Sequence, residues 1–276
     1  MYIYICIQSF NIEGFGTIND VPQDLEYGKD FNIKVSGYEN DPSNTPLVSD
    51  GKDLTIRNYG FTEKQGLVIF LDALGMKGIW KRFRPIEIIQ KWSKVNHAFL
   101  SIEEDPEIQH LDFNFRALSD TIIITISNIN SINNNLHKVF DVLIKPFTNN
   151  IRNKILLRGV ITCGIFYWSD KLIIGPAIDE AAEYHNKVNW IGISTSPSLK
   201  LNLNEMNRNK SLISYRIPWK ERGRESYYEG IVLNWPIYDT NNECMSVLLE
   251  EESQADSNSK IKYNNTYTFY NYCKKI

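Results

Sequence analysis

Apolar positions fall into two periods from about residue 67 onward. Short runs of branched residues indicate buried strands, and spacings of three and four residues indicate amphipathic helices. A single run, "FNFRALSDTIIITIS", predicts a hairpin of two strands that turns at Ser119-Asp120. The other predicted strands are "LVIFLDA" (67–73), "ILLRGVITCGIFYW" (155–168), "KLIIG" (171–175), "WIGISTS" (190–196), "SLISYRIPWK" (211–220) and "SYYEGIVLNWP" (226–236).

Helical spacing appears in three segments between these strands. The segment "RPIEIIQKWSKVNHAFLSI" places Pro85 in a first turn, where proline is favoured. The other two helical segments are "INNNLHKVFDVLIKPF" (132–147) and "PAIDEAAEYHN" (176–186). The expected core positions are Ile86, Ile89, Trp92 and Phe99 in the first helix and Leu136, Val139, Phe140 and Leu143 in the second.

The predicted order is β-α-ββ-α-β-(β)-α-β. This order is typical of an α+β domain in which an antiparallel-containing sheet carries its helices on one face. Residues 63–276 form this domain, and the turn-rich residues 1–62 form a small β-rich appendage whose role the sequence does not indicate. The stretch "LEEESQADSNSK" (249–260) is interpreted as a solvated connection, and the tail "YNNTYTFYNYCKKI" has no assigned role.

Composition narrows the class of protein. The chain has 276 residues and a net charge of −3, so no general nucleic-acid-binding field is expected. Its four cysteines share no metal-ligand spacing, which is typical of a reduced compartment. The N-terminal "MYIYICIQSF" lacks the basic region of a signal peptide, and no apolar run reaches the roughly 20 residues of a membrane span. We therefore expect a soluble, cytoplasmic protein.

Two acids at strand ends are the candidate chemistry. Asp72 follows the apolar run "VIFL", and Asp120 lies at the predicted hairpin tip. Carboxylates on adjacent strand ends can hold hard cations such as Mg²⁺ or Mn²⁺. The turn "ALGMKG" after Asp72 offers backbone amides to phosphate oxygens. The alternative is that each acid simply ends a strand or caps the next element.

The order of several short motifs resembles the catalytic domain of class III nucleotidyl cyclases. The matching segments are "FLDALG", "LSDT" with Ser119 where the family has glycine, "RGVITCG" (158–164), "GPAIDEAAEYH" and a lysine-containing hairpin, "WKERGRESYY". The resemblance spans roughly residues 67–235. It looks closest to the bacterial pyrimidine (cytidylate or uridylate) cyclases of the Pycsar anti-phage system.

This resemblance implies a site and a reaction. Asp72, the Ala73 carbonyl and Asp120 would hold two Mg²⁺ or Mn²⁺ ions, and Lys220 would contact phosphate. Backbone amides of the turn after Asp72 would hold the triphosphate, at Leu74, Gly75, Met76 and Lys77. The ribose 3′-oxygen would attack the α-phosphate and expel pyrophosphate. The family works as a homodimer whose sites are built from two chains, and a separate effector would read the cyclic product.

The base-reading positions suggest a pyrimidine. The family reads purines with residues that correspond here to Arg116 and Leu172, so the usual purine readers are both missing. An arginine fork offers only donors, which suits the adjacent acceptors of cytosine better than the mixed edge of uracil. We therefore expect CTP ahead of UTP. The alternative is that Arg116 pairs with a nearby acid.

Two residues differ from the purine-cyclase pattern in a way that argues against catalytic activity. Asp179 and Glu183 stand where the purine cyclases place Asn and Arg, and an acid cannot stabilise phosphate charge directly. Arg158, Lys77 and Lys81 are the candidates to take over that role. A catalytically silent cyclase-like domain that binds a nucleotide or a protein is therefore the alternative function. A hydrolase or polymerase-like enzyme on a similar two-aspartate sheet is a third.

Overall fold

The computed structural model describes residues 62–276, apart from 77–78, 170–171, 200–209 and 222–223. The expected appendage therefore lies outside the described residues, save for its last position. Contacts divide the chain into two units, one of 1–63 with 167–172 and one of 64–166 with 173–276. In the described part of the first unit, the Tyr167 hydroxyl donates to the Glu63 carboxylate at 2.7 Å.

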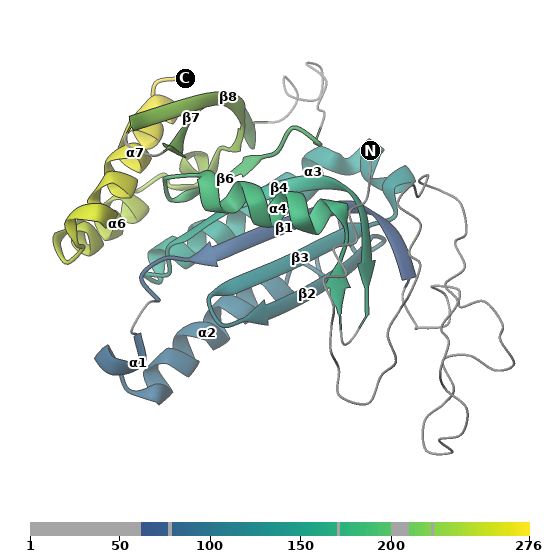
Figure 1. Cartoon of the computed structure of the whole chain (residues 1–276), viewed down its shortest axis with the longest axis horizontal. Helices are drawn as coiled ribbons and strands as arrows, with labels where there is room; N and C mark the ends of the chain where they lie inside the picture. Colours follow the sequence, from purple (N-terminus) through teal and green to yellow (C-terminus); the bar gives the residue numbers. More distant parts are fainter. Residues whose placement is uncertain (1–61, 77–78, 170–171, 200–209, 222–223) are drawn as a thin grey trace, which may run out of the picture. The chain divides into compact units, whose positions relative to one another are not determined.

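A βαββαβ core forms one half of the sheet in the second unit (Figure 1). Its strands lie in the order β2-β3-β1-β4, which is the ferredoxin-like arrangement and confirms the predicted α+β class. The elements are β1 (Thr62–Ala73), α1 (Ile79–Arg82), α2 (Pro85–Leu100), β2 (Asp112–Leu118), β3 (Thr121–Ser127), α3 (Ile129–Arg152) and β4 (Leu157–Trp168).

The second half of the sheet continues from β4 as β6-β8-β7, with β5 paired to β4 at the side. β4 and β6 run parallel, while β7 and β8 form the expected long antiparallel hairpin. These elements are β5 (Ile173–Ile174), α4 (Pro176–Lys187), β6 (Gly192–Thr195), β7 (Leu212–Glu221), β8 (Arg224–Leu233) and the 3-10 helix η2 (Trp235–Tyr238).

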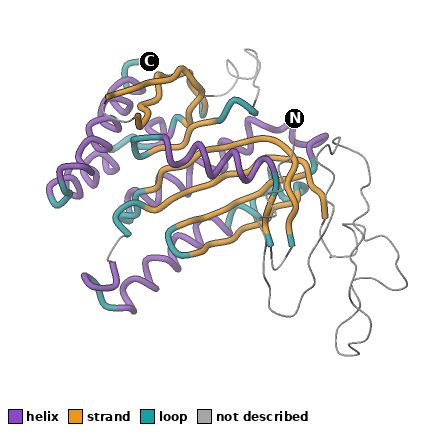
Figure 2. The backbone as a smooth tube through the Cα atoms, in the orientation of Figure 1, coloured by secondary structure: helices purple, strands orange, loops and turns teal. Residues whose placement is uncertain are grey.

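Strand alternation gives the sheet two distinct faces. Alternate residues of β1 and β3, such as Leu71 and Ile124, join α2 and α3 in the main core. The opposite face of β1 and β4 carries α4, where the Thr162 hydroxyl donates to the Ala177 carbonyl at 2.8 Å. We call these the α2–α3 face and the α4 face. Helices therefore cover both faces, as the tube in Figure 2 also shows, and the expectation of helices on one face was wrong.

The predicted core positions are all buried in the second predicted helix but only partly so in the first. Leu136, Val139, Phe140 and Leu143 are buried as expected. In α2 Phe99 is buried as expected, and Trp92 is partly buried against the core. Ile88 and Val95 are also buried. Ile86 and Ile89 are 54% and 55% exposed, because the helix turns the neighbouring stripe toward the sheet.

The polar C-terminal stretch is helical, which corrects its interpretation as a solvated connection. Helices α6 (Glu243–Ser253) and α7 (Ser257–Cys273) occupy it, and α7 includes most of the unassigned tail. Their buried residues Cys244, Leu248, Phe269 and Tyr270 belong to the main core. Among the described helices, none is both long enough and apolar enough to cross a bilayer.

Candidate functional site

Asp72 lies on the α4 face near the end of β1. Its neighbour across one ladder is Thr121 of β3. On the other side β4 runs antiparallel to β1: the Leu74 amide donates to the Leu156 carbonyl at 2.8 Å, and the Thr162 hydroxyl lies 3.5 Å from the Val68 carbonyl. This register brings Arg158 opposite Asp72, while Leu71 and Ala73 face the core.

Asp120 lies beside Asp72 at the tip of the β2–β3 hairpin. The Ala73 amide donates to the Asp120 carbonyl at 2.7 Å, so the two acids come from adjoining backbone segments. Ser119 begins this two-residue turn with a positive φ of 58°, a conformation in which glycine is unstrained.

Asp72 forms an ion pair with Arg158. The Nε and Nη2 atoms of Arg158 each lie 2.8 Å from Oδ2 of Asp72. The two side chains are only 12% and 16% exposed, so solvent screens this pair weakly. Arg158 also reaches the Val188 carbonyl after α4, at 3.5 Å. Among the described residues, no hydrogen bond or ion pair engages the Asp120 carboxylate.

The donor set suits a hard divalent cation in type. Carboxylate oxygens of Asp72 and Asp120 and a backbone carbonyl at Ala73 are the ligands that Mg²⁺ and Mn²⁺ prefer. Arg158 competes for this use, because its guanidinium already neutralises Asp72. A cation would bind through the second oxygen of Asp72 or displace Arg158 from the first.

The turn after β1 offers fewer amides than the sequence suggested. The Ala73 and Leu74 amides are both used in sheet bonds, to Asp120 and Leu156. Gly75 adopts a φ of 76° and is exposed, and Met76 follows it. These two residues are the described phosphate-binding candidates of the turn, and Lys77 lies outside the described residues.

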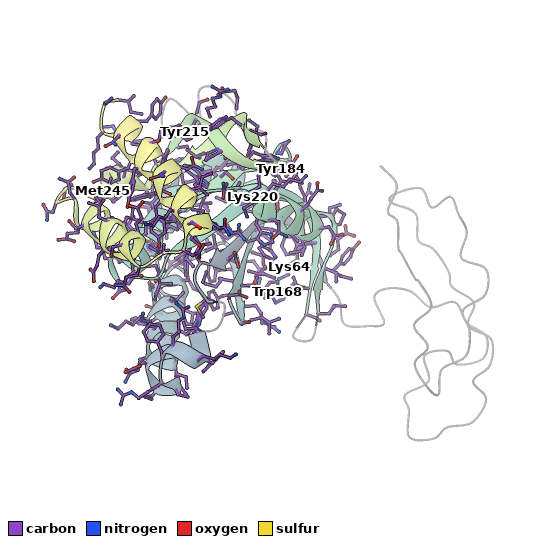
Figure 3. All side chains as sticks on the ribbon, turned by 60° about the vertical axis from the view of Figure 1, so that its left-hand side comes forward. Lys64, Trp168, Tyr184, Tyr215, Lys220 and Met245 are labelled. Atoms are coloured by element: carbon purple, nitrogen blue, oxygen red, sulfur yellow. The ribbon has the colours of Figure 1, made fainter. Side chains whose placement is uncertain are left out.

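Lys220 stands near the end of β7, and its ammonium donates to the Asn186 carbonyl at the end of α4, at 3.0 Å. Although much of the side chain is exposed, burial of the ammonium and then the Arg158 charge lower the pKa of Lys220 to about 8. Figure 3 shows Lys220 beside Tyr184 of α4. Lys220 therefore interacts electrostatically with Asp72 without the help of a second chain.

Two residues that the sequence did not single out stand near this group. Burial lowers the pKa of His185 on α4, and its ring stacks on Phe70 with centroids 4.4 Å apart. Lys262 of α7 interacts electrostatically with both Arg158 and Asp72. The local sequence gave no signal for Lys262, because it lies just after the stretch 249–260, in a helix that the pattern did not predict.

The proposed base readers occupy different units. Arg116 pairs with Ile123, two residues along β3 from Thr121, so it shares the α4 face with Asp72. Leu172 belongs to the first unit and is 40% exposed.

The acids at the family's Asn and Arg positions are exposed on α4. Glu183 pairs with Lys187 one turn later, and Asp179 lies in the first turn. Of the three cations considered as substitutes, Arg158 contacts Asp72, while Lys81 is exposed in α1.

No protein-family model matches the sequence, and no curated protein matches it. Solved structures with a similar course of chain include the adenylyl cyclase CyaB from P. aeruginosa, at 12% identity and a TM-score of 0.43, covering 63% of this chain and 94% of that one. The guanylate cyclase domain of RhGC from Catenaria anguillulae has 12% sequence identity and a TM-score of 0.43, and the match covers 62% of this chain and 99% of that one. An adenylate/guanylate cyclase/hydrolase from Silicibacter pomeroyi has 14% identity and a TM-score of 0.39, and the match covers 62% of this chain and 96% of that one. Likenesses of this size leave the activity to be argued from the residues of the site.

Proposed function

We propose that the protein is a metal-dependent nucleotide cyclase that converts a pyrimidine nucleoside triphosphate to its 3′,5′-cyclic monophosphate and pyrophosphate. The supporting observation is the 2.7 Å backbone bond from the Ala73 amide to the Asp120 carbonyl, which brings the backbone segments of Asp72 and Asp120 together. The cations Arg158 and Lys220 act on Asp72 from the same chain. The order of motifs that resembles class III cyclases supports the same reaction.

Each group of the site has a role in this reaction. Bound Mg²⁺ or Mn²⁺ would supply charge neutralisation of the triphosphate and acidify the ribose 3′-hydroxyl. Asp72 and Asp120 would hold the ions, and Lys220 and Arg158 would orient the phosphates. The 3′-oxygen would bond to the α-phosphorus as its proton passes to water, while the bond from the α-phosphorus to the bridging oxygen breaks and pyrophosphate leaves. Positioning and electrostatic stabilisation account for most of the rate gain.

The pyrimidine preference rests on Arg116. An arginine guanidinium carries donors only, which suits the O2 and N3 acceptors of cytosine, so CTP ranks ahead of UTP. A homodimer with composite sites and a cyclic product that signals in anti-phage defence complete the proposal, on the resemblance alone.

A catalytically silent, nucleotide-binding domain is the second candidate. Arg158 already neutralises Asp72, and Asp179 and Glu183 replace the Asn and Arg of purine cyclases. Such a domain would bind a nucleoside triphosphate and release no product.

The test is a panel of the four nucleoside triphosphates with Mn²⁺ and the purified full chain, with cyclic nucleotide and pyrophosphate measured by chromatography. We expect cyclic product from CTP first and UTP second. Asp72→Ala should lower turnover at least about a hundredfold, because the electrostatic stabilisation of the transition state is lost. Glu103→Ala, an exposed acid away from the site, is the matched control. Binding without turnover of any of the four would favour the silent domain.

A further inference from the structure

Three elements contact the end of α4 and the segment that follows it. Lys220 of β7 donates to the Asn186 carbonyl and Arg158 of β4 to the Val188 carbonyl. From α7, the Asn265 side chain donates to the Asn189 carbonyl at 2.8 Å. The Ile191 amide donates to the Thr266 hydroxyl at 2.9 Å. Residues from both halves of the sheet and from the C-terminal helix therefore bind the same short connection.

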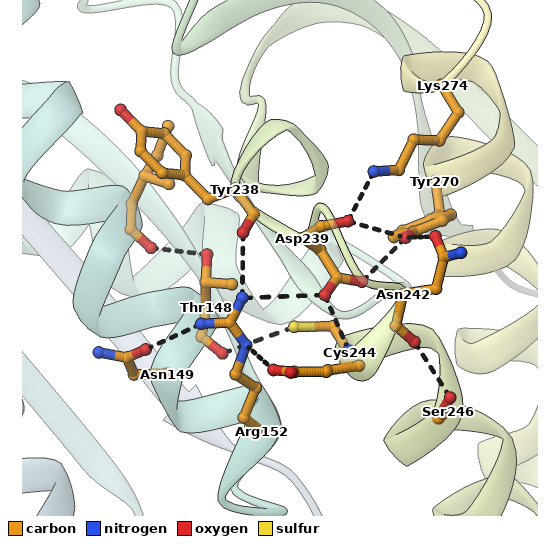
Figure 4. Close-up of polar contacts among 12 residues, drawn as sticks. Thr148, Asn149, Arg152, Tyr238, Asp239, Asn242, Cys244, Ser246, Tyr270 and Lys274 are labelled. Atoms are coloured by element: carbon orange, nitrogen blue, oxygen red, sulfur yellow. Dashed lines mark hydrogen bonds and ion pairs between the residues drawn. The ribbon is translucent and has the colours of Figure 1, made fainter.

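The position of α7 on this connection is firmly fixed. Phe269 is fully buried and packs edge-on against Trp190, with ring centroids 4.6 Å apart. At the far end of the helix, the Tyr270 hydroxyl donates to the fully buried Asp239 carboxylate at 2.8 Å (Figure 4). Arg152 lies 3.9 Å from the same carboxylate. Apolar packing and a buried polar network thus hold α7 in one place.

Lys262 is carried by the face of α7 that makes these contacts. It precedes Thr266 by one turn, and its carbonyl accepts the Thr266 hydroxyl at 2.7 Å. The side chain is half-buried, and burial followed by the Arg158 charge lowers its pKa. Lys220 experiences the same Arg158 charge and that of Lys262. Hence Arg158, Lys220 and Lys262 form one cluster, which we call the cation cluster.

The cation cluster has more positive than negative charge. Its three cations face two carboxylates: Asp72, which pairs with Arg158 among the described residues, and Asp256, which acts on Lys262. Among the described residues, neither lysine ammonium forms an ion pair with an acid. Partly desolvated like charges are unfavourable unless an anion offsets them. Capping of the carbonyls at the end of α4 accounts for Lys220 and Arg158 but not for Lys262, whose carboxylate neighbours are Asp256 and Asp72.

We propose that Lys262, Lys220 and Arg158 of one chain form a binding site for the terminal phosphates of the nucleoside triphosphate and for released pyrophosphate. This inference rests on the proposed function for the identity of the natural ligand. Its new element is that the C-terminal helix supplies a phosphate contact and that no second chain is needed for this part of the site.

The experiment titrates inorganic tripolyphosphate into the metal-free full chain by calorimetry. Wild-type protein should bind it, and Lys262→Met should bind about tenfold more weakly through loss of one charge-assisted hydrogen bond. Lys262→Arg should restore most of the affinity. Lys260→Met, an exposed lysine on the same helix, should bind as wild type and controls for total charge.

Three results would overturn the proposal: no tripolyphosphate binding by wild type, unchanged binding by Lys262→Met, or an equal loss in Lys260→Met. Circular dichroism of each variant shows whether α7 remains folded, and Lys262→Arg separates lost charge from lost fold. The nucleotide panel is scored separately. Tripolyphosphate binding without nucleotide turnover would contradict the proposed cyclase activity but would support the phosphate site at the cation cluster.

Discussion

The pair of Arg158 and Asp72 is the decisive detail at the scale of residues. Its two 2.8 Å contacts bring a permanent cation onto an acid that the cyclase proposal assigns to metal binding. Removing one partner from a weakly exposed pair leaves an uncompensated charge, whereas a divalent cation can replace the missing partner. Stability and metal affinity at Asp72 are therefore linked.

Arg158→Met should make this linkage visible. Without metal we expect a loss of about 2 kcal/mol in the free energy of unfolding, seen as a Tm lower by several degrees. Added Mn²⁺ should recover more stability in the variant than in wild type, because Asp72 is no longer occupied. Differential scanning calorimetry with and without Mn²⁺ measures both. Arg84→Met, which breaks the exposed pair with Glu87, should change neither value; an unchanged Mn²⁺ response in Arg158→Met would contradict the linkage.

Lys220 predicts a pH dependence of phosphate binding. Its lowered pKa of about 8 means that the ammonium is charged below that pH and becomes neutral as the pH rises through it. Its charged neighbours are Arg158 and Lys262, which lower the pKa, and Asp72, which raises it. Tripolyphosphate affinity should therefore fall between about pH 7 and 9. Lys220→Arg should flatten part of that fall, since arginine stays charged, and the ligand's own titration is common to both proteins. Identical profiles would refute the assignment to Lys220.

At the scale of elements, the two C-terminal helices complete the core and place Lys262. The fully buried Asp239 accepts from the Tyr270 hydroxyl at 2.8 Å and the Cys244 amide at 3.1 Å, which joins α7, η2 and α6 (Figure 4). A buried carboxylate of this kind is stable only while its donors remain.

Tyr270→Phe should remove one of these donors and lower the free energy of unfolding by about 1–2 kcal/mol. Chemical denaturation of the two proteins gives the difference. Tyr272→Phe is the matched control, because Tyr272 is exposed and its hydroxyl makes only a 3.5 Å contact to Ser214. Equal effects of the two changes would show that the Asp239 network adds little.

The two C-terminal helices were not predicted from the sequence, whereas other elements were. The hairpin at Ser119-Asp120 and the helix of Leu136 and Phe140 were found because their periods are regular. α7 was missed because its buried residues, such as Phe269, are sparse among polar ones, and tertiary packing rather than amphipathic spacing holds it. Asp72 and Asp120 could be predicted as site residues because they end predicted strands. Lys262 could not, because its place near Asp72 and Arg158 arises only in the folded chain.

At the scale of the whole molecule, the question is which groups one chain supplies. A composite homodimer would take Asp72 from one chain and Arg116 from its partner. In the structure, Lys220 of the cation cluster interacts electrostatically with Asp72 of the same chain.

Mixing inactive variants distinguishes these arrangements. Asp72→Ala mixed with Arg116→Met should recover about a quarter of wild-type turnover, since half of random dimers are mixed and each contains one intact site. Asp72→Ala mixed with Lys220→Met should recover none, because both changes fall in the same single-chain site. Turnover of CTP in equimolar mixtures measures both. Recovery in the second mixture would place Lys220 in the partner's site.

Because Asp72, Arg158, Lys220 and Lys262 are spread from the first described strand to the last helix, a polyanion seated among them would act as a tether on the entire tertiary structure. Its binding energy would oppose complete unfolding more than any local opening. Amide hydrogens of β1, β4, β7 and α7 would then slow their exchange with solvent together, although no two of these elements adjoin along the chain.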